Sequence, residues 1–206
     1  MTGSDISAVV SNDIESVAFD KTSEGHAQPV LLFRGGFACW DRTLAARMPL
    51  DAAAHQKQSP ELWRTWRRGT DGIEVGERMG WRVLPYQVEF GRLERDYVLS
   101  NVFETSAVLF LGGDSFFLET WRYRFNTDET FEYCYTHTIS GAGLIRTERE
   151  RSAGRYQIDG YTVQLEESSG PSTFQALFYS NQYPNEVWID DKYFRIAADP
   201  QQPVCD

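Results

Sequence analysis

The stretch from Phe116 to Thr138, FFLETWRYRFNTDETFEYCYTHT, decides the fold class of this chain. Aromatic and β-branched residues, which are enriched in strands, fill both of its halves. Between the halves, the segment Asn126-Thr127-Asp128-Glu129 consists of residue types that are typical of turns. The pattern therefore predicts a long β-hairpin.

The number of residues in the turn decides which side chains of the two arms face each other, because side chains alternate between the faces of a strand. A two-residue loop would place the arginines of the first arm beside the tyrosines of the second. A loop with an odd number of residues pairs Phe125 with Phe131, Tyr123 with Tyr133, Trp121 with Tyr135, and Glu119 with His137. It also places Arg124 beside Glu132 on the opposite face, which is a favourable cross-strand pair. We predict the odd register, because every pair in it is favourable.

In this register Glu119 and His137 face each other within an otherwise aromatic wall. A carboxylate beside an imidazole can hold one histidine tautomer and tune a proton-transfer group, but many such pairs are only structural. The candidate catalytic residues are Glu119 and His137 as an acid–base pair, with Tyr133 and Tyr135 as hydrogen-bond donors to a developing oxyanion. The candidate ligand-binding residues are Phe117, Trp121, Tyr123, Phe131 and Tyr156. We predict that Glu119 and His137 lie on the concave side of the sheet.

The composition limits the classes of partner. The chain has 206 residues, a formal net charge of -10 and 14% aromatic residues. An acidic protein lacks the basic face that nucleic acids and anionic membranes require, and we expect neither a nucleic-acid nor a membrane partner. No apolar run approaches the ~20 residues of a membrane-spanning helix, and the amino terminus lacks the features of a signal peptide. Oligomeric state is left open.

The three cysteines, Cys39, Cys134 and Cys205, are widely spaced and form no metal-binding pattern. The histidines are likewise not at zinc-ligand spacing, so we expect no metal site. No phosphate loop, dinucleotide fingerprint or nucleophile elbow is present, so we expect no cofactor. With an odd number of cysteines, a reducing cytoplasm is the simplest location.

The chain is expected to form one domain over residues 29–198, between a polar tail at 1–28 and a loose tail at 199–206. Within it, SPELWRTWRRG predicts a helix over residues 60–68: Ser59 suits the N-cap, Pro60 the first turn, and Gly69 the end. Trp63 and Trp66 would cover one end of the fold.

From Gly76 onward, about ten short antiparallel strands alternate with turn signals. Asp159-Gly160 suits a type I′ turn, which would pair Ile158 with Tyr161 and Tyr156 with Val163. Apolar alternation on one side of so many strands must be buried by a second sheet or by closure. We predict closure, which gives a mainly β fold: an antiparallel up-and-down β-barrel with one or two N-terminal helices.

The second half, with G-R-Y-x-I-D-G-Y-x-V from Gly154 and W-I-D-D-K-Y-F from Trp188, resembles lipocalin-like (calycin) β-barrels. The resemblance is architectural and extends from about Gly76 to Ile196. It implies an apolar small molecule bound inside the barrel. Families of that shape include carriers as well as non-redox isomerases, cyclases and chromophore lyases, and no catalytic residue carries over.

Three functions follow as hypotheses. The first is a cofactor-independent cyclase, isomerase or lyase that acts on an apolar substrate inside the barrel. The second is a carrier or sensor that binds the same kind of ligand without changing it. The third is a protein-interaction module whose acidic exterior binds a basic partner. A polar constellation in the interior favours the first, an apolar interior the second, and a contiguous exposed apolar patch the third.

Overall fold

The computed structural model describes residues 13–47, 49–113, 115–168, 170–180 and 182–205. The chain divides into two compact units, Met1–Arg92 and Leu93–Asp206. This differs from the single domain expected over residues 29–198. The supposed tail over 1–28 contains a buried strand from Ile14 onward, while residues 1–12 lie outside the described part.

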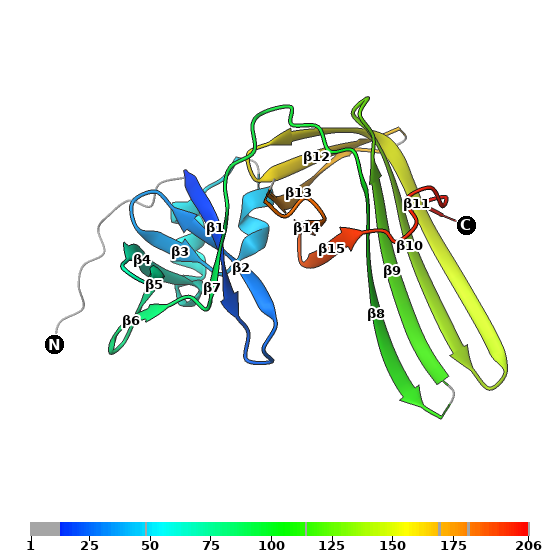
Figure 1. The fold of residues 1–206 in the computed structure, drawn as a ribbon, viewed down its shortest axis with the longest axis horizontal. Coiled ribbons are helices and arrows are strands. Elements are labelled where there is room, and N and C mark those ends of the chain that lie inside the picture. Colours follow the sequence, from blue (N-terminus) through cyan, green and yellow to red (C-terminus); the bar gives the residue numbers. More distant parts are fainter. Residues whose placement is uncertain (1–12, 48, 114, 169, 181, 206) are drawn as a thin grey trace. The chain divides into compact units, whose positions relative to one another are not determined.

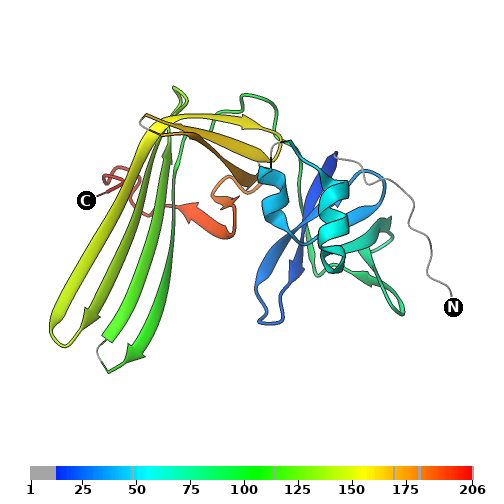
Figure 2. The same cartoon turned by 180° about the vertical axis from the view of Figure 1, so that it is seen from behind.

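The first unit is an antiparallel sheet in the order β6-β5-β4-β3-β2-β1-β7. Its strands are β1 (Ile14–Lys21), β2 (Ala27–Phe33), β3 (Phe37–Cys39), β4 (Trp63–Gly69), β5 (Gly72–Glu77), β6 (Gly80–Val83) and β7 (Tyr86–Phe90). Three short helical segments join β3 to β4: η1 (Arg42–Ala46), α1 (Ala52–Gln58) and η2 (Pro60–Leu62) (Figures 1 and 2). The expected presence of one or two N-terminal helices is thus met by η1 and α1.

The helix predicted over residues 60–68 is wrong. Only Pro60–Leu62 is helical, and the chain then continues as strand β4 between β3 and β5. Trp63 and Trp66 are both buried, but on opposite faces of the sheet: Trp63 packs on Phe33, whereas Trp66 belongs to the cluster that contains Leu32 and Val75. Because this sheet is covered on both faces, its apolar residues need not alternate, and a three-residue spacing resembles a helix.

An ion pair between the buried Asp20 of β1 and the partly exposed Arg82 of β6 joins two strands of the first unit. Asp20, whose side chain is 6% exposed, accepts hydrogen bonds from Arg82 Nη1 and Nη2 at 2.9 and 2.8 Å and from Trp40 Nε1 at 3.0 Å. Burial alone would raise the pKa of Asp20. The bonds from Arg82, the Lys21 amide and Trp40 outweigh this effect and hold the pKa of the carboxyl below its usual value.

The second unit is a closed antiparallel barrel in the order β8-β9-β10-β11-β12-β13-β14-β15, with β15 paired back to β8. Its strands are β8 (Val102–Gly112), β9 (Ser115–Phe125), β10 (Thr130–Gly141), β11 (Leu144–Asp159), β12 (Thr162–Glu167), β13 (Ser172–Tyr179), β14 (Glu186–Ile189) and β15 (Lys192–Ile196). Consecutive strands are neighbours throughout, so the predicted up-and-down barrel is confirmed. Buried side chains fill its interior, among them Phe103, Phe125, Phe131, Ile158 and Phe194, each at most 2% exposed.

Four strands of this unit are much longer than the barrel is tall. β15 pairs with β8 only at Phe103 and Glu104, and β12 pairs with β11 only from Gly154 onward. Beyond these points β8–β11 continue as a four-stranded sheet with two open edges (Figures 1 and 2). We call this extension, residues 105–112, 115–121, 135–141 and 144–150, the distal sheet.

The register of the β9–β10 hairpin is as predicted. Phe125 faces Phe131, Glu119 faces His137, and the other pairs follow in step. On the opposite face, Arg124 Nη1 lies 3.4 Å from Glu132 Oε2.

The register predicted for the Asp159-Gly160 turn is wrong. Ile158 pairs with Val163 and Tyr156 with Leu165, so the loop is Gly160-Tyr161. The chain before β8 explains the shift, because the Leu93 amide donates to the Gly160 carbonyl and the Asp96 amide to the Ile158 carbonyl. A shift of two residues keeps the same side chains on the inner face.

The C-terminal tail is anchored, in contrast to the loose tail expected at 199–206. A disulfide joins Cys134 of β10 to Cys205, with their Cα atoms 5.5 Å apart. Arg122 Nη2 donates to the Asp199 carbonyl at 2.6 Å, and Arg124 Nη2 donates to the Gln202 carbonyl at 2.9 Å. The tail therefore lies against the outer face of β9 and β10.

Candidate functional site

Five of the predicted site residues lie together on the inner face of the distal sheet: Phe117, Glu119, Trp121, Tyr135 and His137. His137 is opposite Glu119 on one side and opposite Glu148 of β11 on the other. In the next row, Tyr135 lies between Trp121 and Glu150 in the same way. Arg146 Nη2 and Glu148 Oε1 form an ion pair at 2.5 Å, as is typical of a salt-bridged, solvent-exposed strand. The two β11 carboxylates, Glu148 and Glu150, are both exposed and were not predicted as part of the site. Their alternation with Arg149 and Arg151 could have assigned them to one face.

The hydrogen bonding of this group differs from a simple carboxylate–imidazole pair. The Tyr135 hydroxyl donates to Glu119 Oε1, and this bond raises the pKa of Tyr135 to about 12. The His137 ring packs on Phe117 with ring centroids 4.5 Å apart. Its Nε2 is buried and has no hydrogen-bond partner among the described residues. Glu119 is therefore held by Tyr135, and His137 keeps one ring nitrogen unused.

Other predicted ligand-binding residues fill the barrel. Phe131, Tyr123 and Tyr156 are at most 5% exposed within its core cluster. The Tyr123 hydroxyl donates to Gln175 Oε1 at 3.2 Å and the Tyr156 hydroxyl to the Leu99 carbonyl at 2.7 Å, so both hydroxyls are already bonded. Tyr133 packs on Tyr123, and burial raises the pKa of Tyr133 to about 12. These side chains support the wall; they are not grouped with Glu119 and His137.

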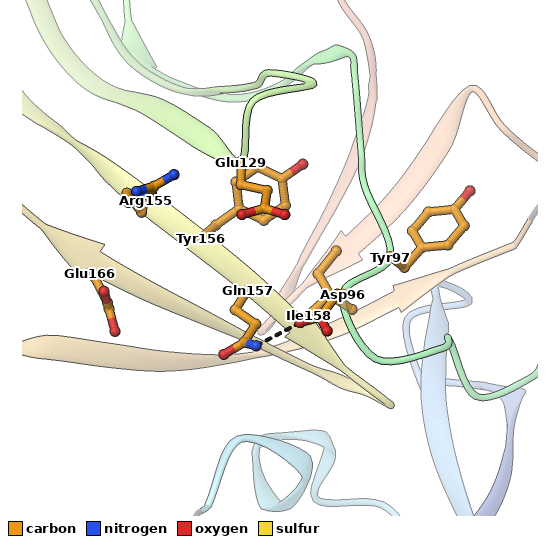
Figure 3. Close-up of a pocket in the computed structure, with 8 residues that line it drawn as sticks. All are labelled: Asp96, Tyr97, Glu129, Arg155, Tyr156, Gln157, Ile158 and Glu166. Atoms are coloured by element: carbon orange, nitrogen blue, oxygen red, sulfur yellow. Dashed lines mark hydrogen bonds between the residues drawn. The ribbon is translucent and has the colours of Figure 1, made fainter.

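Three surface hollows are lined by described residues of this unit, and Glu119 and His137 line none of the three. The one in Figure 3, of about 270 Å³, is lined by Asp96, Tyr97, Glu129, Arg155, Tyr156, Gln157, Ile158 and Glu166. Gln157 Nε2 donates to Asp96 Oδ1 at 2.6 Å, while Arg155 and Glu166 lie at the other end (Figure 3). Two larger, more open hollows lie beside the C-terminal tail and beside β15. None of the three brings an acid–base pair to an apolar pocket.

The end of the distal sheet carries a group of exposed apolar side chains. They are Val108, Leu109, Phe110 and Leu111 of β8, Ile139 of β10, and Leu144 and Ile145 of β11. Phe110, Leu144 and Ile145 are 77%, 76% and 73% exposed. Through Phe116 and Phe117 of β9, the strand pairing connects them into one patch across all four strands. We call this patch the apolar end.

The first unit contains another acid–histidine pair, but both ring nitrogens of its histidine are already hydrogen-bonded. His55 Nε2 lies 3.0 Å from Asp41 Oδ2, while Trp63 Nε1 donates to His55 Nδ1 at 3.1 Å. Because Nδ1 accepts, Nε2 carries the proton and donates to Asp41. Both ring nitrogens are used, so His55 joins α1 to the sheet.

Among the described residues, no group of three or more His, Cys, Asp or Glu side chains is arranged to hold a metal ion. None of the described helices has the length and apolar character needed to cross a membrane.

Fold and site together define a two-unit β protein whose barrel carries an open, four-stranded extension, with aromatic and charged side chains on its inner face and an apolar end. Comparisons of the chain with protein families, curated proteins and solved structures gave no match.

Proposed function

We propose that this protein is an interaction module that binds its partner through the apolar end of the distal sheet. The contiguous exposed patch over β8–β11 is the observation that supports this function. Isolated exposed apolar residues are ordinary, whereas contiguous patches with a polar surround mark binding surfaces. Burying a side chain such as Phe110 or Leu144 on a partner contributes up to roughly 1.5–3 kcal/mol.

The structure lends less support to a ligand inside the barrel. Phe103, Phe125, Phe131 and Phe194 occupy the space in which a carrier or enzyme would hold its ligand. A relationship to lipocalin-like barrels belongs to the proposal only through the shared up-and-down strand order. The surface that we expect to bind is uncharged, unlike the acidic exterior considered from the sequence.

The compartment is also part of the proposal. The Cys134–Cys205 disulfide favours an oxidising environment over the cytoplasm expected from the cysteine count.

A photo-crosslinking amino acid can test the proposed surface. It is placed at Phe110 and, as a control, at Phe174 of β13, which is 41% exposed but lies outside the distal sheet. Irradiation in the native cells should give adducts to a lipid, another protein or a second copy from position 110 and none from position 174. Equal yields of adducts at the two positions, or none at either, would contradict an interaction through the apolar end.

A second candidate function is acid–base catalysis on the inner face of the distal sheet. It is favoured by the unbonded Nε2 of His137, a residue whose neighbours on the two adjacent strands are Glu119 and Glu148. A panel of apolar carbonyl compounds, followed by mass spectrometry, tests it. Conversion should fall by ~10²–10⁴-fold in His137→Ala and Glu119→Gln, as expected for loss of an acid–base group, and should persist in His26→Ala. Absence of conversion by the wild-type protein, or equal rates in all variants, would exclude this function for the panel.

A further inference from the structure

We propose that the partner of the apolar end is the surface of a zwitterionic lipid bilayer, into which the two hairpin tips of the distal sheet insert. This inference rests on the proposed function and names the chemistry of the partner.

The direction of the boundary between apolar and charged residues points to a lipid surface. Apolar side chains lie on both faces of the sheet, with Val108 and Phe110 on one face and Leu109 and Leu111 on the other. The boundary thus runs across the strands and does not separate the two faces. A partner that bound flat on the sheet would require one apolar face only. If the ends of the strands insert into a planar apolar medium, both faces of the inserted part contact that medium, so both must be apolar, as observed.

The β8–β9 and β10–β11 hairpins extend to the same height along the strand direction. Phe116 of β9 pairs with Phe110 of β8 and with Ser140 of β10, which in turn pairs with Ile145 of β11. The β10–β11 turn has the uncharged sequence Ala142-Gly143. The sequence contains no charged residue from Thr138 to Ile145. From Val108 to Leu118 it contains one charged residue, Asp114. The two tips can therefore enter one surface together.

A second copy of the chain explains less of the patch. The unpaired edge of β8 is uncharged from Ser106 to Gly112, so two copies could join there by strand pairing. That contact would leave Leu144 and Ile145, at the opposite edge, exposed. The β11 edge is itself protected against pairing by the run from Arg146 to Arg151. A lipid surface covers both edges at once.

The depth of the apolar end fits insertion at the interface. Its rows run from Val108 to the turn, about four residues, which at ~3.3 Å per residue span roughly 13 Å. A strand that crosses a bilayer needs ~9–11 residues. The tips are long enough to reach the boundary between headgroups and acyl chains, the depth typical of interfacial segments.

The charges behind the apolar end are of both signs. Glu119 and Glu148 share the inner face, whereas Arg149 and Arg151 lie on the outer face. A phosphocholine headgroup carries both a phosphate, which arginine binds, and a quaternary ammonium, which carboxylates and aromatic rings bind. Since the chain has a net charge of -10, an anionic lipid surface would repel it.

Vesicle flotation tests the inference. Phosphatidylcholine vesicles should carry the oxidised full-length protein, and vesicles with added phosphatidylglycerol should carry less. Phe110→Ser and Leu144→Ser should each weaken binding roughly tenfold or more, because each removes an inserted apolar side chain. Phe174→Ser is the matched control and should stay within about twofold of wild type. Circular dichroism and thermal unfolding confirm that each variant is folded. Phe110→Trp adds a direct signal, a blue shift of its emission upon addition of vesicles.

Each other result overturns the inference. If the wild-type protein does not float with phosphatidylcholine, or if Phe110→Ser and Phe174→Ser bind equally, the tips do not insert. A doubled mass in sedimentation equilibrium that Phe110→Ser abolishes would identify a second copy as the partner. Adducts to another protein from position 110 without flotation would leave the interaction module standing and refute only the lipid partner. Neither adducts nor flotation would refute both.

Discussion

Removing the Cys134–Cys205 disulfide should destabilise the second unit by about 4 kcal/mol. The bond joins residues that are 71 positions apart and so closes a long loop in the unfolded chain. In the chain-entropy model, loops of ~15 and ~100 residues correspond to about 3 and 4.7 kcal/mol, which places this loop near the upper value. The bond also holds the tail whose carbonyls accept from Arg122, a residue that is 7% exposed.

Urea unfolding of the Cys134→Ala/Cys205→Ala double variant measures this loss. Reduced wild-type protein is the matched control, since it should show the same midpoint as the variant. Reduction should also make the segment after Ala198 susceptible to proteases. The reasoning is refuted if oxidised and reduced wild type unfold within ~0.5 kcal/mol of each other, the range of an ordinary surface change. It is equally refuted if non-reducing peptide mapping finds Cys134 and Cys205 as free thiols.

Three other substitutions, and a fourth as a control, test the packing. Asp20→Asn should cost about 2 kcal/mol at neutral pH, the loss of charged hydrogen bonds to Arg82. Because the folded pKa of Asp20 is lowered, its stabilisation is present above the unfolded value near ~3.9 and is lost as pH falls through the folded pKa; the variant's urea midpoint should therefore fall less below about pH 4. Trp66→Ala should cost ~3–5 kcal/mol in urea unfolding, and a loss below ~1 kcal/mol would contradict its burial. Gly154→Ala would place a Cβ 1.9 Å from the Glu166 carbonyl oxygen and should cost more than ~2 kcal/mol, whereas Gly91→Ala, with no atom within 4 Å of its Cβ, should stay within ~0.5 kcal/mol.

The hairpin from Phe116 to Thr138 could be predicted because two independent constraints agree. The turn residues locate the loop, and the pairing of Arg124 with Glu132 favours an odd register. The Asp159-Gly160 turn lacks a second constraint of this kind. Its register is set by the segment Leu93–Asp96, which lies more than sixty positions earlier in the chain. A local pattern cannot contain that information.

The helix over residues 60–68 failed for a different reason. Its start signal was genuine, since a 3-10 turn does begin at Pro60. The spacing of Trp63 and Trp66, however, fits a helix with one buried face as well as a strand buried on both faces. Only the neighbours β3 and β5 decide between them. The disulfide could not be predicted either, because no residue near Cys134 in the sequence indicates that the C-terminal tail packs against β10.

The site is exposed because its strands extend beyond the barrel. The alternation of apolar and polar residues along a strand does not indicate how far the strand extends. An alternating strand has the same pattern whether it lies in a closed barrel or extends beyond it. The spacing of the turns does carry the length: β9, β10 and β11 have 11, 12 and 16 residues, whereas β12, β14 and β15 have 6, 4 and 5. Where a long strand neighbours a short one, the residues of the long strand beyond the end of the short one form an excess that is unpaired on that side. The residues in that excess, Glu119 and His137 among them, then lie on an open sheet, and the apolar residues at its end are left exposed.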